Sequence, residues 1–185
     1  AENQFLVGLS LDGDRPANRF RVDAAGREAL PRILEAARLL EKRGVDFNIV
    51  SVVTAASAER APRLYQYFKK KKFFYLQFIP CLDPAPGVTT PASLTPALYG
   101  KFLCELFDLW YADYLAGCSP DIRTFSNWVQ MAAGCPPESC GMAGTCTCYF
   151  VVEGNGNVYP CDFYAADPWL LGTVRDGFRT LAESE

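Results

Sequence analysis

The sequence of 185 residues contains no histidine. This excludes zinc sites that use histidine and the Ser–His and Cys–His pairs of nucleophilic catalysis. The sequence also has no large excess of one charge, because 18 Lys and Arg against 21 Asp and Glu give a formal net charge of −3. A nucleic-acid partner favours a basic face, which a net charge of −3 does not suggest. A membrane span needs about 18 consecutive apolar residues, and no apolar run in this sequence approaches that length. The composition therefore argues against both nucleic acid and a membrane as partners.

Apolar residues make up half of the sequence and aromatic residues 14% of it. This composition is typical of a globular protein, and the length suits one domain plus part of a second. The chain begins without methionine, and only four residues precede its first apolar run. We therefore expect it to be a piece of a longer protein.

Five of the eight cysteines fall in one stretch near the end of the sequence, namely Cys135, Cys140, Cys146, Cys148 and Cys161. The other three, Cys81, Cys104 and Cys118, lie in a predicted strand end and helices, where a lone thiol is commonly buried in the core. Small secreted proteins held by disulfides are rich in cysteine from end to end. The clustered pattern instead favours a metal ion or iron–sulfur cluster in a cytoplasmic protein.

Strands and helices alternate in the first part of the sequence. Apolar and β-branched runs predict strands at 5–9, 47–53 and 74–79, and helical spacing of apolar residues predicts helices at 27–43 and 59–72. This order predicts an α/β fold with a parallel sheet. A proline-rich segment follows, and then two helices at 96–115 and 122–133. The first of them has an apolar stripe that we interpret as packing, formed by Phe102, Leu106, Leu109 and Trp110.

A β-hairpin is predicted inside the cysteine-rich stretch. Two apolar runs, 149–153 and 157–160, flank the turn sequence Gly154-Asn155-Gly156. Cys148 precedes the first arm and Cys161 follows the second. Because the arms of a hairpin are antiparallel, we expect it to bring these two cysteines together.

Polar residues follow each of the three predicted parallel strands. In such folds, ligands bind at the carboxyl ends of the strands. The candidates there are Ser10, Asp12, Gly13, Ser51, Thr54, Gln77, Cys81 and Leu82. Each one alone is typical of a turn or a strand end, but together they predict one rim at which a ligand binds.

The strongest chemical signal is the set Cys140, Cys146 and Cys161, directly followed by Asp162. Three thiolates are one fewer than a closed zinc or iron–sulfur site takes, so the fourth ligand is Cys148, Cys135 or a residue beyond Glu185. The spacing alone does not decide between zinc and a cluster. A carboxylate beside cluster sulfur in a partly dry site would have a raised pKa and could act as a general base. The alternative for Asp162 is a surface residue that ends a hairpin.

The stretch from Ser139 to Tyr164 resembles the anaerobic sulfatase-maturating enzymes, which are radical S-adenosylmethionine (SAM) proteins. The resemblance is carried by the runs SCGMAGTCTCYFVVE and VYPCDFY. Further stretches that fit the same family lie at 8–13, 47–54, 77–83, 107–111 and 171–172. The resemblance thus extends along essentially the whole chain.

This resemblance implies a partial (β/α) TIM-like barrel, of which residues 1–133 would hold the last three strand–helix units. Residues 134–185 would begin a SPASM-type domain for auxiliary [4Fe–4S] clusters. Family members oxidise a cysteine or serine of a sulfatase polypeptide to formylglycine. By this resemblance Cys140, Cys146 and Cys161 match ligands of the first auxiliary cluster, and Asp162 matches the proposed base. Ser10, Arg21 and Leu82 match residues that contact SAM.

Two features of the family are missing from the sequence. The CxxxCxxC loop that holds the radical-generating cluster is absent, as are later cysteines of the auxiliary clusters. We therefore expect the 185 residues alone to be inactive and their cluster sites incomplete. The exposed sheet edges of a half barrel predict a homo-oligomer of the fragment.

Two alternatives to sulfatase maturation stay open from the sequence. One is a maturase of another peptide, because SPASM domains serve several. The other is a non-catalytic module in which Cys135, Cys140, Cys146 and Cys148 hold a structural zinc ion.

Overall fold

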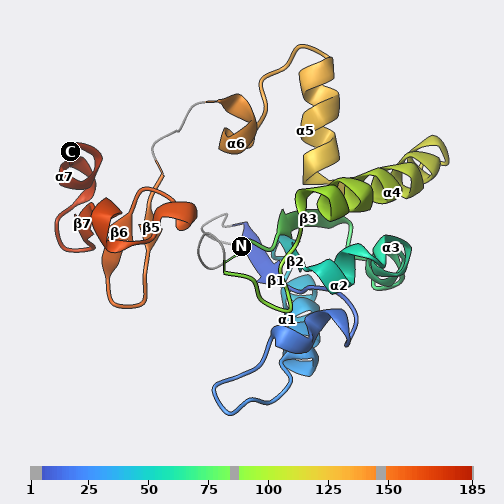
Figure 1. Ribbon diagram of the computed structural model, residues 1–185, viewed down its shortest axis with the longest axis horizontal. Helices are drawn as coiled ribbons and strands as arrows, with labels where there is room; N and C mark the ends of the chain where they lie inside the picture. The colour runs from blue at the N-terminus through green and yellow to red at the C-terminus, as the bar shows by residue number, and fades with distance from the viewer. Residues whose placement is uncertain (1–5, 84–87, 145–148, 185) are drawn as a thin grey trace. The chain divides into compact units, whose positions relative to one another are not determined.

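The computed structural model describes residues 6–83, 88–144 and 149–184 and has two compact units, Ala1–Gly134 and Cys135–Glu185 (Figure 1). At the centre of the first unit is a four-stranded sheet in the order β1-β2-β3-β4. All three strand pairings are parallel. The strands are β1 (Val7–Ser10), β2 (Phe47–Val53), β3 (Tyr75–Pro80) and β4 (Asp121–Ile122). The predicted α/β class with a parallel sheet is confirmed.

The helices of the first unit follow the predicted order, with changes at their ends. They are η1 (Ala17–Phe20), α1 (Leu30–Lys42), α2 (Ala55–Ala58), α3 (Ala61–Lys70), α4 (Pro96–Leu115) and α5 (Arg123–Ala132). Helix α1 begins later than residue 27 because Val22 and Glu28 form an antiparallel bridge before it. Helix α2 was not predicted. It forms because Thr54 and Ser57 make a capping box at its start.

One face of the sheet packs on the helices. Along β2 the side chains alternate, so that Ile49, Ser51 and Val53 are buried while the residues between them are half-buried. Ile49 and Val53 join a core with residues from α3, α4 and α5. The predicted apolar stripe of α4 is confirmed as packing, because Phe102 and Leu106 are fully buried. The opposite face of the sheet carries the half-buried Asn48 and Gln77.

Two of the lone cysteines are not core residues. Cys104 and Cys118 are exposed and Cys81 is half-buried, so the predicted burial of the first two is wrong. Helix α4 buries positions 102, 106 and 110, and this spacing places Cys104 on the other side of the helix. All six cysteines in the described part of the chain are free thiols.

An ion pair joins α3 to α4. Lys69 in the last turn of α3 pairs with Asp113 of α4, and the Tyr65 hydroxyl donates a hydrogen bond to the same carboxylate at 2.7 Å. Burial works to raise the pKa of Asp113, but the hydrogen bonds from Lys69 and Tyr65 outweigh it, so the pKa is lowered. The pKa of Tyr65 is raised, first by its burial and then by Asp113.

We expect the Asp113→Asn variant to lower the free energy of unfolding by roughly 1–3 kcal/mol at neutral pH. Because folding lowers the pKa of this carboxyl, its contribution is present above the unfolded-state pKa of about 3.9 and is lost as the pH falls through the folded-state value. Urea unfolding of both proteins between pH 7 and pH 3 measures this. The control is Asp108→Asn, an exposed position on the same helix. A difference between Asp113→Asn and wild type that stayed constant with pH would contradict the prediction.

The second unit contains a small antiparallel sheet. Its strands are β5 (Val151–Val152), β6 (Asn157–Tyr159) and β7 (Gly172–Thr173), in that order. The predicted hairpin is confirmed, and its turn is closed by the Gly156 N–H, which donates to the Glu153 carbonyl at 2.9 Å. The third strand was not predicted from its two residues. The helical segments of this unit are α6 (Cys140–Ala143), η2 (Asp162–Tyr164), η3 (Asp167–Trp169) and α7 (Phe178–Ala182).

Candidate functional site

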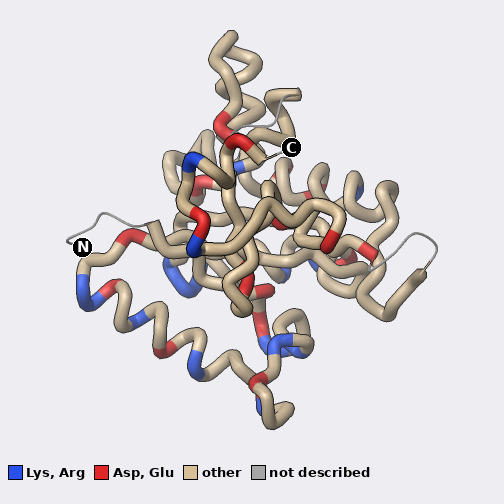
Figure 2. The backbone as a smooth tube through the Cα atoms, turned by 90° about the vertical axis from the view of Figure 1, so that its left-hand side faces the viewer, with Lys and Arg blue, Asp and Glu red and all other residues tan. Residues whose placement is uncertain are grey.

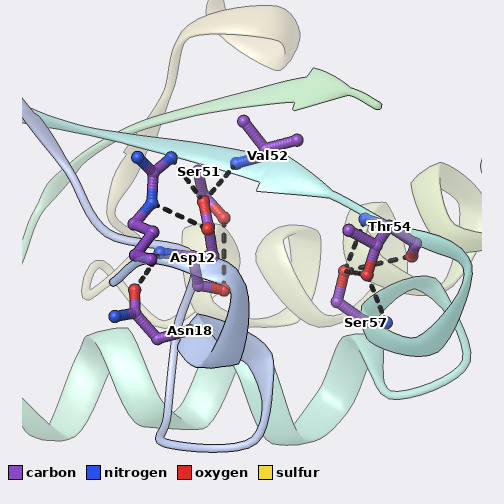
Figure 3. A network of polar contacts seen from close by, with 7 residues as sticks. Asp12, Asn18, Ser51, Val52, Thr54 and Ser57 are labelled. Carbon is purple, nitrogen blue, oxygen red and sulfur yellow. Dashed lines mark hydrogen bonds and ion pairs between the residues drawn. The ribbon is translucent and has the colours of Figure 1, made fainter. Parts of the chain in front are cut away.

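The carboxylate of Asp12 joins the carboxyl ends of β1 and β2. Its Oδ1 accepts the Val52 N–H at 2.8 Å, so the loop after β1 is fixed to β2 (Figure 3). Arg21 donates to the same carboxylate twice, from Nε to Oδ2 at 2.7 Å and from Nη2 to Oδ1 at 2.8 Å. Only 9% of the Asp12 side chain is exposed. This bidentate ion pair is among the strong kinds of charged hydrogen bond, and it fixes the plane of the Arg21 guanidinium at the rim.

The loop between β1 and α1 is shaped by Asn18 in η1. The side-chain oxygen of Asn18 accepts the Asp12 N–H at 3.1 Å, and its backbone carbonyl accepts the Arg21 N–H at 2.9 Å. Asn18 is fully buried, and in the described part of the chain its Nδ2 has no hydrogen-bond partner. A buried donor of this kind is uncommon and costs free energy. Asn18 was not predicted as a site residue, because asparagine in a loop is ordinarily a turn residue.

Next to this network, Thr54 and Ser57 cap α2, as Figure 3 shows. The Thr54 N–H donates to Ser57 Oγ at 2.8 Å. The end of β3 reaches the same edge, where the Cys81 N–H donates to the Val53 carbonyl at 2.9 Å. Burial raises the pKa of the Cys81 thiol, and the charges of Asp83 and Asp12 raise it further. Residues that follow three different strands are thus brought to one edge of the sheet.

The predicted SAM contacts occupy different positions at this edge. Ser10 is the last residue of β1 and is exposed. Leu82 follows β3 and is 59% exposed. Arg21 is paired with Asp12, whose carboxylate also accepts the Val52 N–H at the end of β2. The structure brings Asp12 and Arg21 into contact, whereas Ser10 and Leu82 stay free to meet a ligand.

Three polar side chains, those of Asn48, Gln77 and Arg123, are linked by hydrogen bonds, and the first two lie on the sheet face opposite the buried core. Asn48 Nδ2 donates to Gln77 Oε1 at 3.5 Å, and Arg123 Nη1 donates to the same oxygen at 3.3 Å. Gln77 was among the predicted rim residues, whereas Asn48 and Arg123 were not predicted. The available signal was one polar residue, Asn48 or Gln77, inside each of two otherwise apolar strands, where an apolar residue is typical of a buried sheet.

In the second unit, the Cys161 thiol interacts with its neighbour Asp162. A backbone hydrogen bond from Phe163 lowers the pKa of the Cys161 thiol, but burial, Asp162 and the charge of Cys140 together outweigh it and raise the pKa. The Cys161 thiol donates to Asp162 Oδ1 at 3.3 Å.

The rest of the predicted cysteine set lies outside the described residues. These are Cys146, the third predicted ligand, and Cys148, which the hairpin was expected to bring toward Cys161. Within the described ranges no three Cys, Asp or Glu side chains gather as a metal site. Asp162 itself is exposed, so the second unit by itself does not supply the partly dry site that we expected around this carboxylate.

Charges of both signs are distributed along the chain. Figure 2 shows Lys and Arg interleaved with Asp and Glu, in keeping with the formal charge of −3. Across the part of the chain that the structure covers, no helix has both the length and the apolar character that crossing a membrane requires.

The chain is similar to curated anaerobic sulfatase-maturating enzymes. It is 47% identical over 179 residues to a cysteine-type enzyme from Clostridium perfringens. This alignment covers 95% of this chain and 48% of the relative. A cysteine-type enzyme from Clostridium novyi is 42% identical, and a serine-type enzyme from Bacteroides thetaiotaomicron is 30% identical over 192 residues. The chain therefore spans about half the length of the curated relatives it matches. A comparison with models of protein families finds no match.

Solved structures match the chain along its whole length. One is described as tagged anSMEcpe with bound AdoMet, with a TM-score of 0.89 and 46% identity, covering 100% of this chain and 49% of the other. A second, described as native anSMEcpe with bound AdoMet and Kp18Cys peptide, has a TM-score of 0.88 at 46% identity and is covered to 52%. At this level of identity, the match extends to sequence as well as fold.

Proposed function

Because this chain belongs to the family of the anaerobic sulfatase-maturating enzymes, we propose that it is part of an enzyme that oxidises a sulfatase side chain to formylglycine. The observation that carries this proposal is the similarity over 95% of the chain to relatives of that one activity. Cysteine is the favoured target, because the cysteine-type relatives are 42% to 47% identical and the serine-type ones 27% to 30%.

In this proposal the first unit forms part of a (β/α) barrel, and its strand ends hold SAM. Ser10, Arg21 and Leu82 line the edge where polar groups after β1, β2 and β3 converge. The guanidinium of Arg21 is fixed by Asp12 at that edge, and a fixed guanidinium suits the carboxylate of the methionine part of SAM. The exposed Leu82 offers an apolar surface for its adenine ring.

The second unit begins an auxiliary-cluster domain of the SPASM type. Cys140 and Cys161 would hold a [4Fe–4S] cluster together with Cys146, and the similarity to the relatives over 95% of the chain supports this assignment. When bound, SAM and the clusters supply the radical and electron-transfer chemistry that no side chain can provide. Asp162 would take up a proton from the target side chain at its carboxylate, next to the cluster ligand Cys161.

The overall change is an oxidation by two electrons. A cysteine side chain CH₂SH and one water become an aldehyde CHO and H₂S, with release of two protons and two electrons. A serine side chain loses the same two protons and two electrons directly. Asp162 would accept one of these protons. The sulfatase polypeptide is the partner protein that carries the oxidised side chain.

Self-association of the 185 residues stays a prediction.

The test uses the complete protein with its clusters reconstituted, SAM, a reductant and a sulfatase peptide that carries either cysteine or serine. We expect mass spectrometry to detect the aldehyde, faster with the cysteine peptide. If the protein consumed SAM with an unrelated peptide but not with the sulfatase peptides, it would be a maturase of another peptide. Zinc without acid-labile sulfide in the purified protein would support a structural zinc module and overturn the proposal.

A further inference from the structure

Arg21 is held by Asp12 along only one edge of its guanidinium. A guanidinium has five N–H donors arranged as two forks, one at Nε and Nη2 and one at Nη1 and Nη2. Asp12 takes the first fork, with distances of 2.7 and 2.8 Å. In the described part of the chain the Arg21 side chain has no other partner, and 26% of it is exposed. The second fork is therefore available for another planar anion.

We propose that Asp12 is a positioning residue that holds Arg21 with its second fork directed at the carboxylate of bound SAM. This inference rests on the proposed function and deepens it, because it assigns a task to a residue that does not itself touch the ligand. A carboxylate fits the free fork with two parallel hydrogen bonds, as Asp12 fits the other. Arg21 is thus a bridge between a protein carboxylate and a ligand carboxylate.

Asp12 is suited to this task because it is itself fixed from three sides. Its Oδ1 accepts the Val52 N–H from β2, its own N–H donates to Asn18 in η1, and its carbonyl accepts from Ser51 Oγ at 3.5 Å. A carboxylate anchored in this way has little freedom to rotate. The arginine that it binds is consequently held at a constant place relative to the ends of β1 and β2.

The charge of the pair determines what Arg21 can contribute. Because Asp12 largely neutralises the guanidinium, the attraction for a ligand carboxylate depends on the geometry of the hydrogen bonds more than on net charge. Without Asp12, the long Arg21 side chain would regain its rotamer freedom and would have to lose it again on binding. The affinity for SAM should then fall even though the guanidinium is still present.

The test is to measure the affinity of the complete protein for SAM and for decarboxylated SAM, by equilibrium dialysis without reductant. We expect Asp12→Ala to weaken the binding of SAM about 10- to 100-fold and to leave decarboxylated SAM nearly unchanged. Arg21→Ala should do the same, and the double variant should be little worse than either single one. Arg21→Lys, which keeps a charge but has no fork, should also lose the preference for SAM.

Asp113→Asn is the matched control, because it breaks another ion pair in the same unit, between α3 and α4. It should bind both ligands as the wild type does. Equal weakening of both ligands by Asp12→Ala, or no weakening, would overturn the positioning role. If Asp12→Ala does not fold, the Arg21→Lys result decides, and an unchanged preference for SAM would overturn the inference. A folded wild type that binds neither ligand would instead contradict the proposed function.

Discussion

Replacing Asp162 with asparagine is expected to slow formylglycine formation by about 10²- to 10⁴-fold, the range for loss of a general base. The amide cannot accept a proton from the target side chain, whereas its size and its position beside Cys161 are kept. We therefore expect the cluster content and the affinity for SAM to be unchanged. Single-turnover assays with the complete protein, followed by mass spectrometry of the peptide, measure the rate.

The control for this variant is Asp167→Asn. Asp167 is another exposed carboxylate of the second unit, at the start of η3, and it carries no predicted role. It should leave the rate within about twofold of wild type, since surface substitutions away from a site have small effects. If both variants slow the reaction equally, or if Asp162→Asn retains the full rate, then Asp162 is not the base. It would then be the surface residue of the alternative interpretation.

Replacing Gly13 with alanine is expected to destabilise the first unit by about 2–6 kcal/mol. Gly13 has a φ of +132°, a conformation that residues with a side chain rarely adopt, and this alone costs about 1–3 kcal/mol. A Cβ at this position would lie 2.2 Å from Leu64 Cδ1 and 3.2 Å from the Ala17 Cβ. Leu64 is buried in the core, so relieving the clash costs a further 1–3 kcal/mol or so.

Urea unfolding followed by circular dichroism measures this effect. Gly26→Ala is the matched control, because Gly26 also has a positive φ, +74°, but has nothing within 4 Å of an added Cβ. It should cost only about 1–2 kcal/mol. A double variant with Leu64→Ala should be less destabilised than the sum of the two single variants, because the truncated side chain removes the clash. Equal losses for Gly13→Ala and Gly26→Ala would contradict the packing explanation.

The sequence by itself determined the order of most elements of the first unit and the hairpin of the second. The alternation of β-branched runs with helical spacing predicted β1, β2, β3, α4 and α5, because each pattern is set by local propensity and by which face is apolar. The turn Gly154-Asn155-Gly156 predicted the hairpin for the same local reason. The cysteines near Asp162 indicated metal or cluster chemistry because few side chains can bind such groups.

Other features depended on contacts between distant parts of the chain, and only the tertiary structure decided them. Strand β4 has two residues, too few to carry a pattern, and forms because β3 offers a free edge. Lys69 forms an ion pair with Asp113, a residue 44 positions away in the sequence.

The pairing of Asp12 with Arg21 belongs to the same group. Asp12 was predicted as a rim residue and Arg21 as a SAM contact, but neither residue predicts its pairing with the other from the sequence around it. The loop through η1 brings them together across nine positions, and β2 fixes the carboxylate with a backbone N–H 40 positions away. Local sequence patterns specify which groups are present, whereas hydrogen bonds between separate elements decide where those groups are held and what they can bind.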